Sequence, residues 1–145
     1  MRAKERKKLY DDVKSRVETI LEKVAFVEER SPETVKAYRE KLETRIREML
    51  ADATVDEGRL LTEVAVFADK SNIDEELTRL HSHIAQFREI CKEGIVGRKL
   101  DFLVQEFNRE ANTTCSKSND VTITRAGLAL KNEIEKIREQ IQNIE

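Results

Sequence analysis

The sequence has few of the residues that interrupt helices. Its 145 residues include one proline, four glycines and no tryptophan, whereas charged residues make up 39% of the chain. Sheets joined by tight turns need more glycine and proline, and strands favour β-branched and aromatic residues. The composition therefore argues against an all-β fold and favours long amphipathic helices.

Long apolar runs and paired cysteines are also missing. The longest uninterrupted apolar run is Val64–Ala68, whereas a helix that spans a bilayer needs about 20 apolar residues. The basic start of the chain is not followed by the apolar stretch of a signal peptide. Cys91 and Cys115 lie far apart and form no CxxC motif, which is typical of a reducing, cytoplasmic setting.

The charge is nearly balanced, with a formal net charge of −2. Residues 51–97 are the acidic part, with 10 acidic and 5 basic side chains. This balance excludes a generally basic nucleic-acid binder and leaves room for a local basic patch. The basic run at residues 2–8 is typical of a solvated helix start, with contact to RNA as the alternative.

Apolar residues recur at steps of three and four, which predicts helices along most of the chain. The expected helices cover residues 2–29, 32–50, 56–69, 74 to a loop at 93–97, 98 onward, and 130–144. The Ser31–Pro32–Glu33 sequence favours a helix start, with a capping serine, a first-turn proline and an acid. Asn112–Asp120 has no apolar period, so it is either a loop or a polar continuation of the preceding helix.

These elements predict an all-α fold in two parts. Residues 1–55 are expected to form an antiparallel helical hairpin with a tight corner near Pro32. Residues 56–145 are expected to form a helical bundle with a long C-terminal helix. The apolar spacing of that last helix alternates between four and three residues, as in a coiled-coil seam.

The helix that begins near Arg98 is unusually polar on one side. Asp101, Gln105, Asn108 and Asn112 fall on a stripe separate from the apolar one. Asparagine is a poor helix former, so a merely solvated face would favour Glu, Lys or Arg. The stripe therefore indicates hydrogen bonding to a ligand or to a partner chain.

A second polar side of this helix carries Glu106 and Glu110, which are four residues apart. Like charges at this spacing repel, and a divalent cation with oxygen ligands would remove the repulsion. Arg109 lies beside them, where a guanidinium could clamp a phosphate. The alternative is an ordinary exposed acidic pair that Lys99 neutralises.

The two histidines, His81 and His83, cannot share a metal on one helix because residues two apart point in nearly opposite directions. At most one of them faces a site. The nearby run Asp74–Glu76 is first of all an acidic helix start favoured by the helix dipole.

Several runs together resemble the signature of the YicC/YloC family. The matching runs are Ile73–Leu77, Arg79–Leu80, Ser82–His83, Gln86–Phe87, Gly97–Thr113, Ser116–Lys117 and Glu135–Glu145. The resemblance implies a bacterial endoribonuclease that uses a divalent cation, Mg²⁺ or Mn²⁺, and that forms a homo-oligomer, a hexamer in the full-length protein. It also implies that this chain is a C-terminal portion without the family's N-terminal domain. His81 and Thr114–Cys115 depart from the family's pattern.

We assign roles within this pattern. The expected catalytic residues are His83, Glu106, Arg109 and Glu110. The expected metal ligands are Glu75, Glu76, Glu106 and Glu110. The expected RNA contacts are Arg79, Arg98, Lys99, Gln105, Asn112, Ser116 and Lys117.

The leading hypothesis is metal-assisted cleavage of RNA phosphodiester bonds, with His83 as general acid or base. The rival is a non-catalytic helical module that drives oligomerisation or positions RNA. On the first hypothesis, the 145-residue chain alone is expected to be weakly active or inactive.

Overall fold

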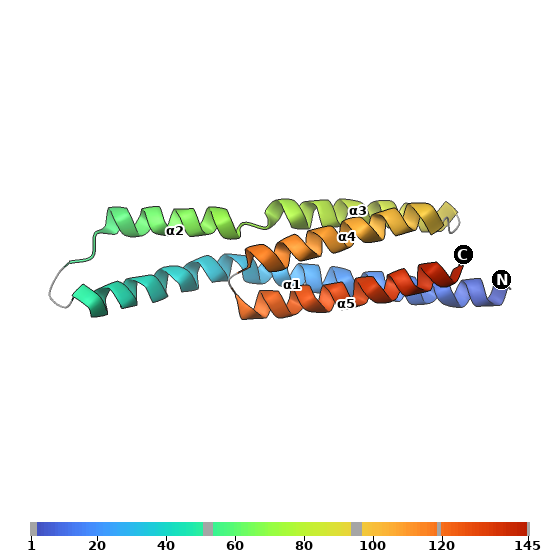
Figure 1. Cartoon of the computed structure of the whole chain (residues 1–145), viewed down its shortest axis with the longest axis horizontal. Coiled ribbons are helices and arrows are strands. Elements are labelled where there is room, and N and C mark those ends of the chain that lie inside the picture. The colour runs from blue at the N-terminus through green and yellow to red at the C-terminus, as the bar shows by residue number, and fades with distance from the viewer. Residues whose placement is uncertain (1–2, 51–53, 94–96, 119, 145) are drawn as a thin grey trace.

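The computed structural model describes residues 3–50, 54–93, 97–118 and 120–144. They form five helices, and no strand occurs among them (Figure 1). The helices are α1 (Ala3–Leu50), α2 (Glu57–Ser71), α3 (Asp74–Glu93), α4 (Gly97–Lys117) and α5 (Val121–Ile144). The predicted all-α class is confirmed. None of the described helices is long and apolar enough to cross a bilayer.

A four-helix bundle forms the core of the molecule. The first half of α1 packs beside α3 and α5, and α4 also packs against both of these helices. All four contribute buried apolar side chains to one shared cluster. The predicted seam of α5 faces this cluster, since Leu130, Ile134, Ile137 and Ile141 are all buried. The core thus joins the start of the chain to its C-terminal helices and does not divide near residue 55.

The predicted corner at Pro32 is wrong, because α1 runs unbroken from Ala3 to Leu50. Proline lacks one N–H group, so the carbonyl of Glu28 loses its helical partner at a cost of about 3 kcal/mol. Pro32 is exposed, which lets water solvate that carbonyl. The Thr34 hydroxyl donates to the Ser31 carbonyl at 2.7 Å, so Ser31 is a residue of the continuing helix and not its cap. Packing on both sides of the proline outweighs the local stop signal.

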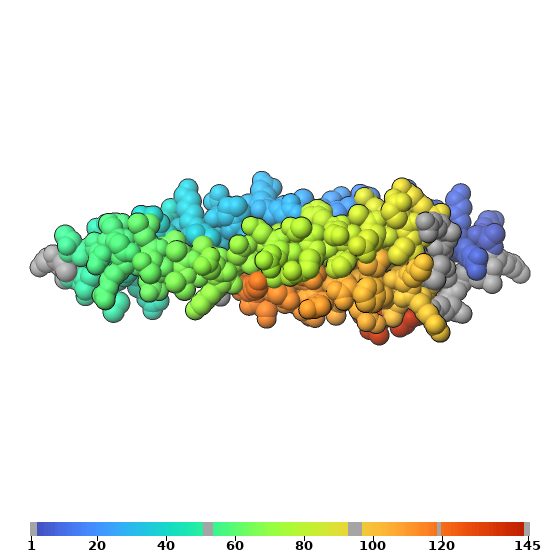
Figure 2. All heavy atoms as spheres, turned by 90° about the horizontal axis from the view of Figure 1, so that it is seen from above, coloured from blue at the N-terminus to red at the C-terminus, as the bar shows by residue number. Residues whose placement is uncertain are grey.

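The hairpin is formed instead by the second half of α1 and by α2, which runs back beside it (Figure 1). Tyr38 and Phe67 stack across this pair with their ring centroids 3.9 Å apart. The pair forms an arm that extends past the bundle, and Figure 2 shows α2 projecting beyond the end of α4. The Asp56 carboxylate accepts from the Arg59 amide at 3.2 Å, so the predicted cap of this helix is confirmed.

Helix α4 continues to Lys117, which settles the open question about Asn112–Asp120 in favour of helix for most of that stretch. Thr114 is buried and its hydroxyl donates to the Glu110 carbonyl at 2.9 Å. Residues 118 and 120 then connect α4 to α5. The extra helical turn brings Lys117 beside the start of α3, which matters for the site described next.

Candidate functional site

Three side chains with metal-binding atoms meet between α3 and α4. His83 comes from α3, whereas Glu106 and Glu110 come from successive turns of α4. One ligand atom from each lies within 4.8 Å of the other two. The two helices are antiparallel neighbours (Figure 1), so this arrangement depends on their packing and not on local spacing alone.

The cluster is half-buried and short of hydrogen-bond partners. Glu110 is 3% exposed, and the Nε2 atom of His83 lies 3.8 Å from an oxygen of Glu106. The Nδ1 atom of His83 is buried, and no described residue bonds to it. A buried polar atom without a partner is unfavourable. One imidazole and two carboxylates form a donor set suited to divalent first-row metals.

Arg79 of α3 holds Glu110 in place. Its Nε atom donates to the Glu110 carboxylate at 3.0 Å, and its Nη2 atom lies 3.5 Å from Glu76. The pKa of Arg79 is raised, mainly by the hydrogen bond to Glu110. The guanidinium thus bridges two buried carboxylates and fixes the orientation of Glu110, one of the three residues of the cluster.

Glu76 is the second buried carboxylate, and Lys117 compensates its charge. The Lys117 ammonium donates to Glu76 at 2.7 Å and to the Asn72 carbonyl at 3.3 Å. Burial raises the pKa of Glu76, but the hydrogen bond from Lys117, a backbone hydrogen bond and the charges of Lys117 and Arg79 together outweigh it, and the pKa lies below its usual range. Glu76 and Glu75, both expected as metal ligands, lie outside the three-residue cluster. Glu75 is exposed and lies near Arg79.

Arg109, expected as a catalytic residue, and the remaining expected RNA contacts are spread along α4. Arg109 is 74% exposed at the rim of the cluster, 3.9 Å from Glu106. Gln105 donates to Asp101 at 3.2 Å on the exposed polar stripe. The structure also leaves Asn112 and Ser116 exposed on α4, and Arg98 and Lys99 exposed in its first turn.

Sequence reasoning missed an exposed aromatic residue beside the cluster. Phe102 is 60% exposed on α4, one turn before Glu106. It lines a shallow groove of about 300 Å³ between α3 and α4, with Gln86, Ile90, Arg98, Lys99 and Leu103. The signal was present in the sequence, because Phe102 falls outside the apolar stripe of its helix.

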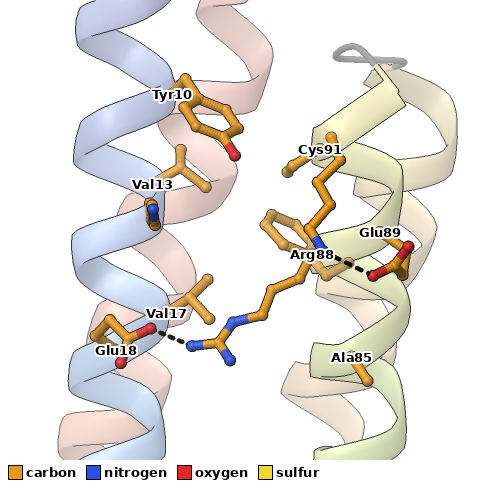
Figure 3. Close-up of a pocket in the computed structure, with 11 residues that line it drawn as sticks. Tyr10, Val13, Val17, Glu18, Ala85, Arg88, Glu89 and Cys91 are labelled. Carbon is orange, nitrogen blue, oxygen red and sulfur yellow. Dashed lines mark hydrogen bonds and ion pairs between the residues drawn. The ribbon is translucent and has the colours of Figure 1, made fainter.

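Another cavity, of about 500 Å³, lies between α1 and α3 (Figure 3). Tyr10, Val13 and Val17 line one wall, and Arg88 crosses the opening to pair with Glu18. Cys91 of α3 lies on the opposite wall, where burial raises the pKa of its thiol to about 11. A protonated thiol is a poor nucleophile, so this cavity offers no catalytic group comparable to the cluster.

His81, the other histidine, pairs with Glu28 of α1 at the surface. It therefore lies apart from the cluster that contains His83. Burial also raises the pKa of Cys115, which keeps that thiol protonated. Both observations leave the cluster of His83, Glu106 and Glu110 as the place where reactive groups gather in the described part of the chain.

Comparison with known proteins identifies similar sequences. The family profile described as endoribonuclease YicC-like, C-terminal, matches residues 27–145. A Clostridioides difficile (strain 630) protein named probable endoribonuclease YicC is 50% identical over 147 residues. A Haemophilus influenzae (strain Rd) protein with the same name is 40% identical over 146 residues. Each alignment covers 100% of this chain and 50% of the relative, so the chain spans about half the length of the curated relatives it matches.

Proposed function

Because the chain belongs to the YicC-like endoribonuclease family, whose C-terminal profile it matches, we propose that it contributes a divalent-metal centre to the cleavage of RNA phosphodiester bonds. His83, Glu106 and Glu110 would hold the cation. The observation that carries this proposal is the approach of these three residues' ligand atoms to within 4.8 Å of one another, from two separate helices.

The donor set also bears on the identity of the metal. Magnesium prefers oxygen ligands in a strict octahedral arrangement, whereas imidazole suits first-row transition metals. Since His83 contributes a nitrogen, we expect Mn²⁺ to bind more tightly than Mg²⁺.

Each residue of the site then has a distinct part. The bound cation would supply an activated water and charge stabilisation at the phosphoryl oxygens. His83 acts as a ligand, with proton transfer as the alternative role. Arg79 positions Glu110, and Arg109, which is 74% exposed, is able to reach a phosphate of the substrate. Lys117 neutralises Glu76, which removes an uncompensated negative charge from the approach of RNA.

Oligomerisation is a second function, favoured by the exposed polar stripe on α4. Gln105, Asn108 and Asn112 all face outward, as the sequence pattern predicts for contact with another chain. We infer that copies of the whole protein associate through such faces, with the hexamer and the cytoplasmic setting as predictions. Both functions are compatible, because the cluster lies on a neighbouring side of α4.

The test is Mn²⁺ binding to the 145-residue chain, measured by isothermal titration calorimetry. Glu106→Gln and Glu110→Gln should each weaken Mn²⁺ binding by more than about tenfold. Glu135→Gln on α5, which removes an exposed and distant carboxylate, should leave binding unchanged. Wild-type affinity in both site variants would refute the metal centre.

RNA cleavage is measured in parallel on this chain and on a version extended to the length of its relatives. Metal-dependent cleavage by the extended protein should be lost in both site variants, while sedimentation velocity shows unchanged assembly. If Glu106→Gln instead dissociates the oligomer and leaves Mn²⁺ affinity intact, the assembly function is correct and the catalytic one is wrong.

A further inference from the structure

Phe102 is exposed next to two cationic side chains. Its side chain is 60% exposed although it belongs to a helix whose apolar stripe is fully buried. Arg98 lies one turn before it on α4, and Lys99 precedes it by three residues. All three line the shallow groove between α3 and α4. An exposed ring beside two cations is an arrangement that binds groups with a flat apolar face and an attached anion.

The groove lies next to the candidate metal cluster along α4. Phe102 and Glu106 are four residues apart, so they share a side of α4 and differ by about 6 Å along its axis. On α3, Gln86 follows His83 by three residues and also lines the groove. Arg98 is about 12 Å along α4 from Glu106. A chain molecule bound at the cluster would therefore meet the Phe102 ring next.

The chemistry of the groove changes along its length. Beyond one end of the groove, the cluster carries Glu106 and Glu110, which favour a cation. The groove itself carries Arg98 and Lys99, which favour an anion. The aromatic residue lies between the acids and the cations along α4, and the Gln86 amide can both donate and accept hydrogen bonds. A nucleotide combines a stacking base, polar base edges and a phosphate, so it matches each part of this surface.

Pairing of the base decides which nucleic acid fits. Inside a duplex both faces of a base are covered by its neighbours, and a side chain cannot stack on them without unstacking the helix. Phe102 therefore favours an unpaired nucleotide. Resting on the proposed function, which makes RNA the substrate, we propose that the groove lined by Gln86, Arg98, Lys99 and Phe102 stacks an unpaired base of that RNA on the Phe102 ring, one helical turn from the candidate metal cluster.

Because the chain contains no tryptophan, the fluorescence of a single introduced tryptophan reports on this contact directly. Phe102→Trp keeps an aromatic face and places the sole indole in the groove. Leu128→Trp is the matched control, since Leu128 is 55% exposed on α5 and does not line the groove. Both proteins are titrated at low salt without divalent metal, using a short oligouridylate, an abasic oligonucleotide of equal length, and an RNA duplex.

The oligouridylate should quench the emission of Phe102→Trp, and the abasic strand and the duplex should quench it much less. The Leu128→Trp emission should not respond to any of them. Unchanged Phe102→Trp emission under conditions where a labelled oligouridylate binds the same protein would overturn the proposal, because the base would then lie elsewhere. Equal quenching by the abasic strand would overturn it as well, since phosphates alone would explain the binding.

Affinity provides the second measurement. Stacking contributes about 1–3 kcal/mol per base, so Phe102→Ala should weaken oligouridylate binding by about 5- to 100-fold in fluorescence anisotropy. Leu128→Ala should bind as the wild type does, and circular dichroism confirms that both variants are folded. Wild-type affinity of Phe102→Ala refutes the base-binding role. A change of its sedimentation coefficient with no loss of RNA affinity shows that Phe102 contacts another copy instead, which also refutes it.

These outcomes are separable from those of the metal centre. The titrations contain no divalent cation and can be repeated in Glu110→Gln, so quenching that persists there supports the groove even if the catalytic proposal fails. Conversely, Mn²⁺ affinity that depends on Glu106 and Glu110 stands whether or not Phe102 binds a base.

Discussion

Replacing Lys117 by methionine removes the main partner of a buried carboxylate. The Lys117 ammonium lies 2.7 Å from Oε1 of Glu76, a residue that is 2% exposed. The other carboxylate oxygen, Oε2, is buried and has no hydrogen-bond partner among the described residues. Methionine keeps most of the apolar stem of lysine and removes only the charge. In Lys117→Met, Glu76 would rely on Arg79, whose nearest nitrogen is 3.5 Å away.

The expected loss of stability follows from this geometry. Breaking a fully buried ion pair costs about 3–5 kcal/mol, but Lys117 is 36% exposed and water screens part of the interaction. We therefore expect Lys117→Met to lower the free energy of unfolding by about 1–3 kcal/mol at neutral pH. Replacing both partners by apolar residues, as in Glu76→Met with Lys117→Met, should recover most of this loss.

The effect should depend on pH with a definite sign. Burial raises the pKa of Glu76, but the hydrogen bonds to it and the charges of Lys117 and Arg79 together outweigh burial, so the folded-state pKa is below the ordinary value. The stability that the pair contributes is therefore present above about pH 4, the ordinary range of a glutamate, and is lost as the pH falls through the folded-state pKa. The difference between wild type and Lys117→Met should accordingly shrink in acid.

Urea unfolding followed by circular dichroism, at neutral and at acidic pH, measures this difference. Lys92→Met is the matched control, because Lys92 is 68% exposed and pairs with Glu89 at the surface. That variant should change the free energy of unfolding by less than about 1 kcal/mol. A Lys117→Met protein as stable as the wild type at neutral pH, or a difference that does not shrink in acid, would refute the reasoning.

Much of the fold could be predicted because its signals are local. Asp56 precedes α2 as a capping residue, and Asn72 ends the helix near the predicted break. The alternation of four and three along α5 predicts a buried seam, and the described seam residues are buried. Each of these features depends on neighbours within one or two turns, which a sequence displays directly.

The corner at Pro32 could not be judged from such signals. Ser31, Pro32 and Glu33 form a plausible helix start, yet the residues on both sides continue one helix. Apolar contacts in the bundle before Pro32, and the stacking of Tyr38 on Phe67 after it, hold the helix together. These contacts join residues far apart in the sequence, so spacing alone does not reveal them.

The candidate site likewise combines features that the sequence predicts with features that depend on the packing of the helices. The Glu106 and Glu110 pair follows from their spacing, and His83 follows from the family resemblance. The hydrogen bond from Arg79 to Glu110 and the burial of Glu76 depend on the register of α3 against α4. Sequence patterning therefore places the acids on one face of a helix, whereas the packing of α3 on α4 decides which of them meet His83 and which meet Arg79.

Two further predictions test packing that the sequence did not reveal. Pro32→Ala restores the N–H that can bond to the Glu28 carbonyl, so it should raise the free energy of unfolding by about 1–2 kcal/mol; a loss of stability would indicate a corner there after all. Gly127→Ala should destabilise the bundle by about 1–3 kcal/mol, because its new Cβ atom would lie 2.4 Å from the Cys115 sulfur. Adding Cys115→Ala should restore most of that stability in urea unfolding, since the Cys115 Cβ atom is 3.9 Å away, an ordinary contact distance. If the double variant is no more stable than Gly127→Ala alone, the thiol is not what makes glycine necessary at this crossing of α4 and α5.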